Sequence, residues 1–131
     1  MTDKILKTEE EWKKELSPDQ YHVLREKGTE TRFEGKYVNE HADGVYHCAA
    51  CNNPLFASSH KYDSKSGWPS FDEALPGAVE YKEDNSHGMH RVEVVCARCG
   101  SHLGHVFPDG PEDTTGQRFC MNSISLDLQK E

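Results

Sequence analysis

The sequence contains Cys48-Ala49-Ala50-Cys51 and, much further along the chain, Cys96-Ala97-Arg98-Cys99, both in the frame C-A-x-C-x-x-x-L. Each Cys-x-x-Cys pair can present two thiolates at a turn, and two such turns complete the four-sulfur set of a structural zinc site. Iron or an iron–sulfur cluster could use the same donors. Without a metal, the four would be unrelated buried or redox-active cysteines. We predict one structural Zn²⁺ per chain, held by Cys48, Cys51, Cys96 and Cys99.

The composition predicts one domain with a small hydrophobic core. The chain has 131 residues, of which 34% are hydrophobic and 29% are charged, and single domains usually hold about 100–200 residues. We expect residues 1–131 to form a single domain, with a helical N-terminal cover over residues 1–28 and a β core over residues 31–128. A metal that joins distant segments would help to stabilise such a core.

Charge and hydropathy argue against several classes of partner. Lys and Arg number 15 against 23 Asp and Glu, a net charge of −8, and no basic cluster is present that could release counterions from nucleic acid. No apolar run approaches the roughly 20 residues of a membrane span, and residues 1–10 lack the apolar centre of a secretion signal. We therefore expect a cytoplasmic protein that binds neither nucleic acid nor membranes, in which the five cysteines provide a metal site and one thiol.

Local signals place two helices near the N-terminus. Thr8 followed by Glu11 forms a capping box, in which each side chain accepts from a backbone donor of the first turn. Ser17, with Pro18 after it, predicts a second helix start, and Gly28 is expected to end that helix. Beyond residue 31 the pattern changes to short strands and turns, with strands expected at 45–48, 92–95 and 123–128.

The fifth cysteine lies in Arg118-Phe119-Cys120-Met121-Asn122-Ser123. In a strand, residues 118, 120 and 122 share one face, while Phe119 and Met121 face the core. A guanidinium beside a thiol favours the nucleophilic thiolate. A lone cysteine in a strand is, however, more often an inert small hydrophobic residue, so a reactive Cys120 and a packing Cys120 both remain possible from this segment alone.

Histidines are the natural proton carriers for such a thiol, because imidazole titrates near neutral pH. His102 and His105 would point to opposite sides of an ideal strand, but Gly104 permits a bulge that brings them to the same side. His87 and His90 are further candidates. The chain has eight histidines, so each one alone is a weak signal, and a surface or spectator role is the alternative.

The loop Gly67-Trp68-Pro69-Ser70-Phe71 places a tryptophan beside a rigid turn. Such a residue is either a core plug or one wall of a pocket, and spacing alone favours the plug because most aromatic side chains serve packing.

Taken together, these segments resemble the B-type methionine sulfoxide reductases, which act on the R epimer of methionine sulfoxide. The likeness runs in order from about Glu11 to Leu128. It rests on these matching segments: Tyr46-His47-Cys48-Ala49-Ala50-Cys51, Lys61-Tyr62-Asp63-Ser64, Gly67-Trp68-Pro69-Ser70-Phe71, Ser86-His87-Gly88-Met89, Cys96-Ala97-Arg98-Cys99, His102-Leu103-Gly104-His105-Val106-Phe107-Pro108-Asp109-Gly110-Pro111 and Arg118-Phe119-Cys120-Met121-Asn122-Ser123.

The resemblance implies a mainly β fold in which two antiparallel sheets form a barrel-like core, with N-terminal helices and zinc-binding knuckles. It implies that Cys120 is the nucleophile and that His102 and His105 lie beside the sulfoxide oxygen. Asn122, Arg118 and Asp109 would orient the groups and stabilise the thiolate. The resemblance makes Trp68 a pocket wall for the substrate methyl group, against the plug favoured by spacing. The expected substrate contacts are Trp68, Phe119 and His102, although strand alternation turns Phe119 to the core.

The sequence departs from this family at Ser66. Many members carry a cysteine there that attacks the oxidised nucleophile, and thioredoxin then opens the resulting disulfide. With Ser66 in that position, we expect the oxidised Cys120 to require an external thiol, from thioredoxin, glutaredoxin or a small thiol. The expected partners are therefore proteins or peptides that contain methionine sulfoxide, and a thiol reductant.

Two other interpretations compete with the reductase. A non-catalytic zinc-binding module would use a similar β fold but has no need of a thiol beside a cation. A Cys–His hydrolase would use Cys120 to attack a carbonyl carbon and would need an oxyanion hole, for which the sequence shows no obvious candidate.

Overall fold

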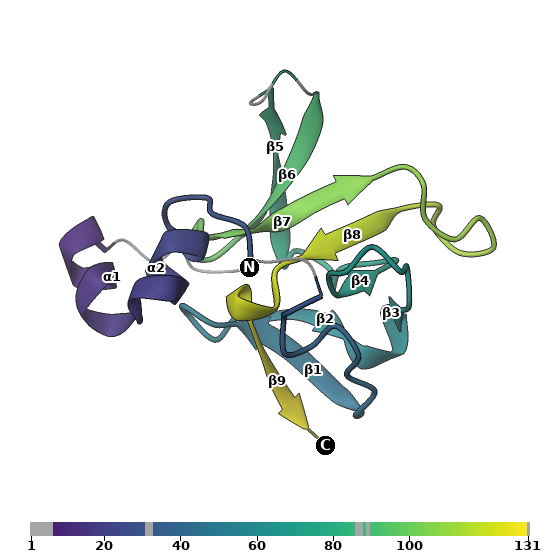
Figure 1. Ribbon diagram of the computed structural model, residues 1–131, viewed down its shortest axis with the longest axis horizontal. Helices are drawn as coiled ribbons and strands as arrows, with labels where there is room; N and C mark the ends of the chain where they lie inside the picture. Colours follow the sequence, from purple (N-terminus) through teal and green to yellow (C-terminus); the bar gives the residue numbers. More distant parts are fainter. Residues whose placement is uncertain (1–6, 31–32, 86–87, 89, 131) are drawn as a thin grey trace.

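The computed structural model describes residues 7–30, 33–85, 88 and 90–130. Two short helices come first, α1 at Glu9–Glu15 and α2 at Pro18–Leu24, and they lie together at one side of the molecule (Figure 1). Both predicted helix starts are confirmed, because Thr8 and Ser17 each form a capping box with the residue three positions later. Helix α2 ends at Leu24 rather than near Gly28, whose N–H donates to the carbonyl of His22 (2.9 Å).

The strands form two antiparallel sheets. The smaller sheet has the order β2-β1-β9, with β1 at Gly44–Cys48, β2 at Pro54–Ala57 and β9 at Leu126–Lys130. The six-stranded sheet has the order β3-β4-β8-β7-β6-β5. Its strands are β3 (Lys61–Tyr62), β4 (Ser70–Phe71), β5 (Val79–Asp84), β6 (Arg91–Cys96), β7 (His102–Phe107) and β8 (Arg118–Met121).

The mainly β fold with two antiparallel sheets is therefore confirmed. Over the described part of the chain, β3 and β5 are the two ends of the larger sheet, so the sheets are not closed into the expected barrel (Figure 1). The strand predicted from Ser123 is also shorter than expected. Residues Ser123–Ser125 form a 3₁₀ turn, η3, because the side-chain hydroxyls of Ser123 and Ser125 are buried in hydrogen bonds with other segments, and β9 begins only at Leu126.

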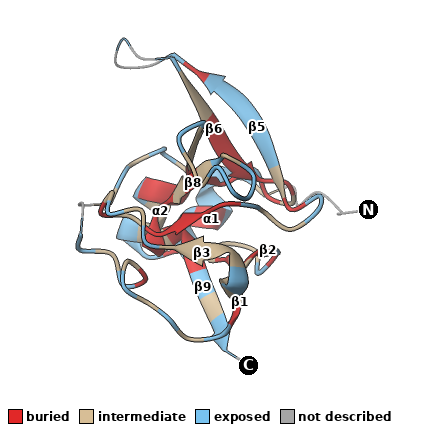
Figure 2. Cartoon of the chain, turned by 90° about the vertical axis from the view of Figure 1, so that its right-hand side faces the viewer, coloured by how far each residue is buried: buried red, intermediate tan, exposed pale blue. Residues whose placement is uncertain are grey.

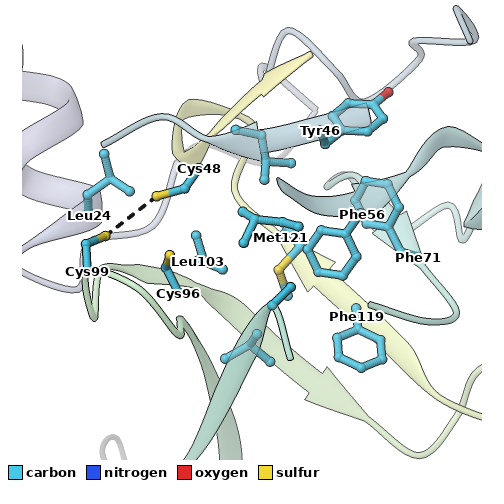
Figure 3. Packing of buried hydrophobic residues seen from close by; sticks show 14 of the residues in the cluster. Leu24, Tyr46, Cys48, Phe56, Phe71, Cys96, Cys99, Leu103, Phe119 and Met121 are labelled. Carbon is cyan, nitrogen blue, oxygen red and sulfur yellow. Dashed lines mark hydrogen bonds between the residues drawn. The ribbon is translucent and has the colours of Figure 1, made fainter. Parts of the chain in front are cut away.

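The hydrophobic core lies between the two sheets. Phe56 from the smaller sheet stacks on Phe71 from the larger one, with ring centroids 4.4 Å apart. Tyr46 and Phe119 meet these rings edge-on, at 5.1 and 5.7 Å. Figure 3 shows the aromatic cluster, with Met121 and Leu103 between it and the cysteines. The core therefore fixes β8 by the side chains of Phe119 and Met121, which leaves the opposite face of β8 free for chemistry.

The helices cover the edge of the core next to the second cysteine pair. Helix α2 contacts η3 and β7, and Leu24 is buried. Arg25, which caps α2, donates from Nη1 to the carbonyl of Cys99 (2.9 Å) and to Oγ of Ser101 (3.2 Å). None of the helices in the described ranges has the length and apolar character needed to cross a lipid bilayer.

Candidate active site and metal centre

Cys120 lies in a row of side chains that crosses the six-stranded sheet. Cys120 on β8 is directly opposite Ser70 on β4 and His105 on β7. His105 is in turn opposite Glu93 on β6. Directly opposite residues of antiparallel strands point to the same side of the sheet. The sheet therefore brings the thiol and an imidazole together, although they lie far apart along the chain.

Alternation along β8 divides its side chains as predicted. Phe119 and Met121 are fully buried, while Arg118, Cys120 and Asn122 line a cavity of about 280 Å³. Phe119 is an expected substrate contact that the structure does not bring to this cavity. Its side chain points to the other face of the strand and packs against Phe56 and Tyr81.

A bulge in β7 arranges the histidines. The register of β7 against β6 shifts by one residue, because Val94 is opposite Gly104 while Val95 is opposite His102. The rings of His102 and His105 are consequently close, with centroids 5.4 Å apart. The predicted bulge is therefore present. Gly104 also permits the close approach of β8, because a Cβ at that position would lie 2.1 Å from the carbonyl oxygen of Cys120.

The two histidines occupy different environments. His105 lines the cavity, and its Nε2 donates to Oδ2 of Asp84 (2.7 Å). His102 is buried behind it, and its Nδ1 donates to Oε2 of Glu93 (2.7 Å). Burial lowers the pKa of His102 below its ordinary value, and the hydrogen bond to Glu93 opposes this effect. Of the pair, His105 is therefore the group that can meet a ligand in the cavity.

Of the two further candidate histidines, the structure describes only His90. His90 is exposed, with Nδ1 2.7 Å from Oδ1 of Asn85, and His87 lies outside the described residues.

The thiol of Cys120 is subject to opposing influences. Burial raises its pKa above the ordinary cysteine value, while the charge of Arg118 and hydrogen bonds from Ser66 and Arg118 lower it. Arg118 is held by a two-pronged contact with Asp109, from Nε to Oδ1 at 2.9 Å and from Nη2 to Oδ2 at 3.3 Å. This ion pair lowers the pKa of Asp109. The predicted cation is thus present, although it only partly offsets the burial of the thiol.

Trp68 lines the same cavity, and its position is fixed by Glu30. The indole Nε1 donates to the carbonyl of Glu30 (3.1 Å), and Glu30 N–H donates to Oδ1 of Asn122 (3.1 Å). Trp68 is therefore in a wall position rather than a core plug. Asn122 also donates from Nδ2 to the carbonyl of Leu103 (3.2 Å), so both ends of its amide hold backbone segments around the cavity.

No sequence pattern indicated Asp84 or Glu30 as residues of the site. Both act through contacts between segments distant along the chain. Glu93 carries a weak signal that could have been used, since it interrupts the apolar run Val92-Glu93-Val94-Val95. A charged residue within a buried strand requires a partner, and here the partners are His102 and Lys27, whose Nζ lies 3.2 Å from Oε1 of Glu93.

Cys48, Cys96 and Cys99 lie at the end of the core away from the aromatic rings (Figure 3), and Cys51 completes a set of four cysteines with them. Their Sγ atoms all lie within 4.8 Å of one another, with Cys48–Cys99 at 3.7 Å and Cys51–Cys96 at 3.6 Å. Four thiolates about 2.3 Å from one tetrahedral ion would be about 3.8 Å apart. The donors and their spacing thus fit a single metal ion. None of these cysteines lines the cavity of Cys120.

Comparison with known proteins places these features in a family. The model of the SelR domain matches residues 16–130. A protein from Chromohalobacter salexigens called peptide methionine sulfoxide reductase MsrB is 57% identical over 129 residues, which cover 98% of this chain and 97% of the relative. A protein with the same name from Thiobacillus denitrificans is 60% identical, over 92% of this chain and 91% of the relative. Another with this name, from Pseudomonas savastanoi pv. phaseolicola, is also 60% identical, over 96% of each chain.

Proposed function

This chain belongs to the SelR domain family, and we propose that it reduces the R epimer of peptide- or protein-bound methionine sulfoxide to methionine. The observation that carries the proposal is the opposition of Cys120 and His105 across β8 and β7 in a cavity that Trp68 also lines. A thiol, a proton donor and an apolar wall are the groups that this reduction requires.

The chemistry transfers an oxygen atom between two sulfurs. The thiolate of Cys120 attacks the polarised sulfoxide while protonated His105 supplies a proton to the oxygen, which is otherwise a poor leaving group. The S–O bond of the substrate breaks and an S–O bond forms on Cys120. Methionine sulfur gains two electrons and the cysteine sulfur loses two, so the products are methionine and a sulfenic acid on Cys120.

The remaining cavity residues prepare this step. Arg118, held by Asp109, stabilises the thiolate against the effect of burial. Trp68 offers its ring to the substrate methyl group, and Asn122 keeps the wall in place through Glu30. The ring of His102 packs edge-on against the ring of His105, with centroids 5.4 Å apart, and so helps to hold it in place.

Regeneration of the enzyme needs thiols from outside the chain. A first thiol attacks the sulfenic sulfur of Cys120 and releases water, which leaves a mixed disulfide. A second thiol, from the same or another molecule, then releases Cys120 in its reduced form. Ser66 lies beside Cys120 but has no sulfur to form an internal disulfide. Thioredoxin, glutaredoxin or a small thiol would serve as the reductant.

We assign the four-cysteine site to zinc with a structural role. The ligands would be Cys48, Cys51, Cys96 and Cys99, and a bound ion would join the turn after β1 to the turn after β6. Asn53 donates from Nδ2 towards Sγ of Cys96 (3.7 Å), a contact that suits a thiolate ligand.

We further propose that residues 1–131 act as one reductase domain in the cytoplasm. The five cysteines are all free of disulfides, which suits a reducing compartment, and the contact of Arg25 with Cys99 joins the helices to the β core.

The test is an epimer-resolved assay. Peptides that carry either the R or the S epimer of methionine sulfoxide are incubated with the protein, once with dithiothreitol and once with thioredoxin and its reductase. We expect consumption of the R epimer alone and loss of activity in Cys120→Ser, which should retain its zinc. Unchanged R peptide with the parent protein would refute the proposal in favour of a non-catalytic zinc module.

A further inference from the structure

We propose that Asp84 is a positioning residue that holds His105 in the tautomer required for proton delivery, an inference that rests on the proposed function. Oδ2 of Asp84 accepts a hydrogen bond from Nε2 of His105 at 2.7 Å. His105 lines the cavity, whereas Asp84 does not. Asp84 would therefore act on the reaction through His105, without touching the substrate.

The burial of Asp84 is unusual for its strand. Most of β5 is exposed (Figure 2), including residues 80–83. Asp84 at the end of β5 is only 6% exposed. A carboxylate is costly to bury without partners, and this one has the imidazole of His105 and the guanidinium of Arg91, whose Nη2 lies 3.4 Å from the same Oδ2. The end of β5 thus places a carboxylate beside Nε2 of His105.

The hydrogen bond from Nε2 to Asp84 leaves Nδ1 as the ring nitrogen of His105 that can exchange a proton with a ligand. A carboxylate only accepts, so Nε2 carries a proton in both charge states of the ring. Nδ1 is then the nitrogen that gains and loses a proton. When His105 is protonated, Nδ1–H can be donated to the sulfoxide oxygen.

Other charged groups that face His105 have different partners. Glu93, opposite His105 on β6, is committed to His102 and Lys27. Arg118 on β8 is paired with Asp109. The ring of His102 and the thiol of Cys120 are the neighbouring titratable groups on β7 and β8. Among the described residues, Asp84 is thus the carboxylate that accepts a hydrogen bond from the cavity histidine.

The structure offers a matched control for this inference. Asp84 and Glu93 are both buried, and each accepts from a histidine at 2.7 Å. Only the histidine bound to Asp84 lines the cavity. Asp84→Asn keeps an oxygen acceptor but removes the charge, and Glu93→Gln does the same for the second pair.

The experiment measures the single-turnover rate of R-epimer reduction against pH in both variants. In Asp84→Asn we expect a roughly tenfold loss of rate at pH 8, because the amide of Asn can donate to Nε2 as well as accept from it, and so no longer fixes the proton there. In Glu93→Gln we expect the rate of the folded protein to fall less, whatever the loss of stability. An unchanged rate in Asp84→Asn, or an equal loss in both variants, would overturn the inference.

A second measurement uses the unmodified protein and does not depend on a variant that folds. Nitrogen NMR of ¹⁵N-histidine-labelled protein at pH 8 reports the tautomer of His105. We expect the proton on Nε2, and a proton on Nδ1 would contradict the role of Asp84. Failure of the parent to reduce the R peptide would instead refute the proposed function, so the two failures are distinguishable.

Discussion

Ser66 and Cys120 line the same cavity, and a hydrogen bond from the Ser66 side chain lowers the pKa of the Cys120 thiol, although strands β4 to β7 separate the two residues along the chain. Ser66 also contacts Trp68, because the backbone N–H of Trp68 donates to Oγ of Ser66 (3.4 Å). Position 66 is therefore next to both the nucleophile and the proposed substrate wall. The identity of this one side chain decides how the oxidised thiol can be resolved.

Ser66→Cys should convert the chain to a two-cysteine enzyme. After one turnover without reductant, we expect an internal disulfide between positions 66 and 120, because the replaced hydroxyl already contacts the thiol. The parent should instead hold a sulfenic acid that a dimedone reagent traps. Intact-mass and peptide-mass spectrometry distinguish the two products. A disulfide between Cys120 and one of the four metal-site cysteines in the parent would contradict this account.

Arg118→Ala should make the thiol less reactive at neutral pH. Burial raises the pKa of Cys120 and Arg118 lowers it, so removal of the guanidinium moves the pKa further up and reduces the thiolate fraction. We expect alkylation of Cys120 by iodoacetamide at pH 7 to slow roughly tenfold, with the loss recovered at higher pH. Asp109→Asn keeps the cation and should slow alkylation less. Equal rates in Arg118→Ala and the parent across the pH range would exclude this role.

His105→Asn should slow single-turnover reduction by about 10²–10⁴-fold, the usual cost of losing a general acid. His90→Asn is the matched control, because His90 is exposed outside the cavity. Rapid-quench analysis of methionine formation gives the rate of the chemical step. The acid role of His105 is wrong if its variant matches the parent at every pH.

Asn122→Ala should lower the stability of the fold as well as activity. The side chain is 4% exposed, and both ends of its amide are hydrogen-bonded to the backbone, at Glu30 and Leu103. Truncation removes the acceptor of the Glu30 N–H, whereas the Leu103 carbonyl keeps the hydrogen bond from the Asn122 N–H. The loss should cost about 1–3 kcal/mol in the free energy of unfolding. Urea denaturation measures the loss, and Asn39→Ala, at an exposed position, should change it little. A fully stable but inactive Asn122→Ala would show that the amide acts on the substrate instead.

Loss of the metal should unfold the core rather than alter the chemistry directly. Cys51→Ser removes one of the four sulfurs, and we expect zinc content to fall and the free energy of unfolding to drop by about 4 kcal/mol or more. Cys120→Ser makes the same chemical change outside the metal site and should keep one equivalent of zinc. Elemental analysis and urea denaturation check both variants. A zinc-free parent that is as stable as the purified protein would rule out the structural role.

Local sequence determined the features that depend on neighbours along the chain. Spacing set the two capped helix starts and the four-cysteine cluster. Alternation along β8 separated Phe119 and Met121 in the core from Cys120 in the cavity, because the side chains of a strand point to opposite faces in turn. The same rule places the side chain of Phe119, an expected substrate contact, in the core instead of the cavity.

Only the tertiary structure decided which distant residues serve the cavity. Asp84 reaches His105 from another strand, and Glu30 reaches Asn122 and Trp68 from an N-terminal loop. Pairing between strands depends on the register that the whole sheet adopts, including the bulge at Gly104. Burial also set the balance at Cys120, where desolvation outweighs the cation that the sequence indicated. Periodicity reports the face on which a residue lies, whereas the packing of the sheets supplies its partners and its dielectric environment.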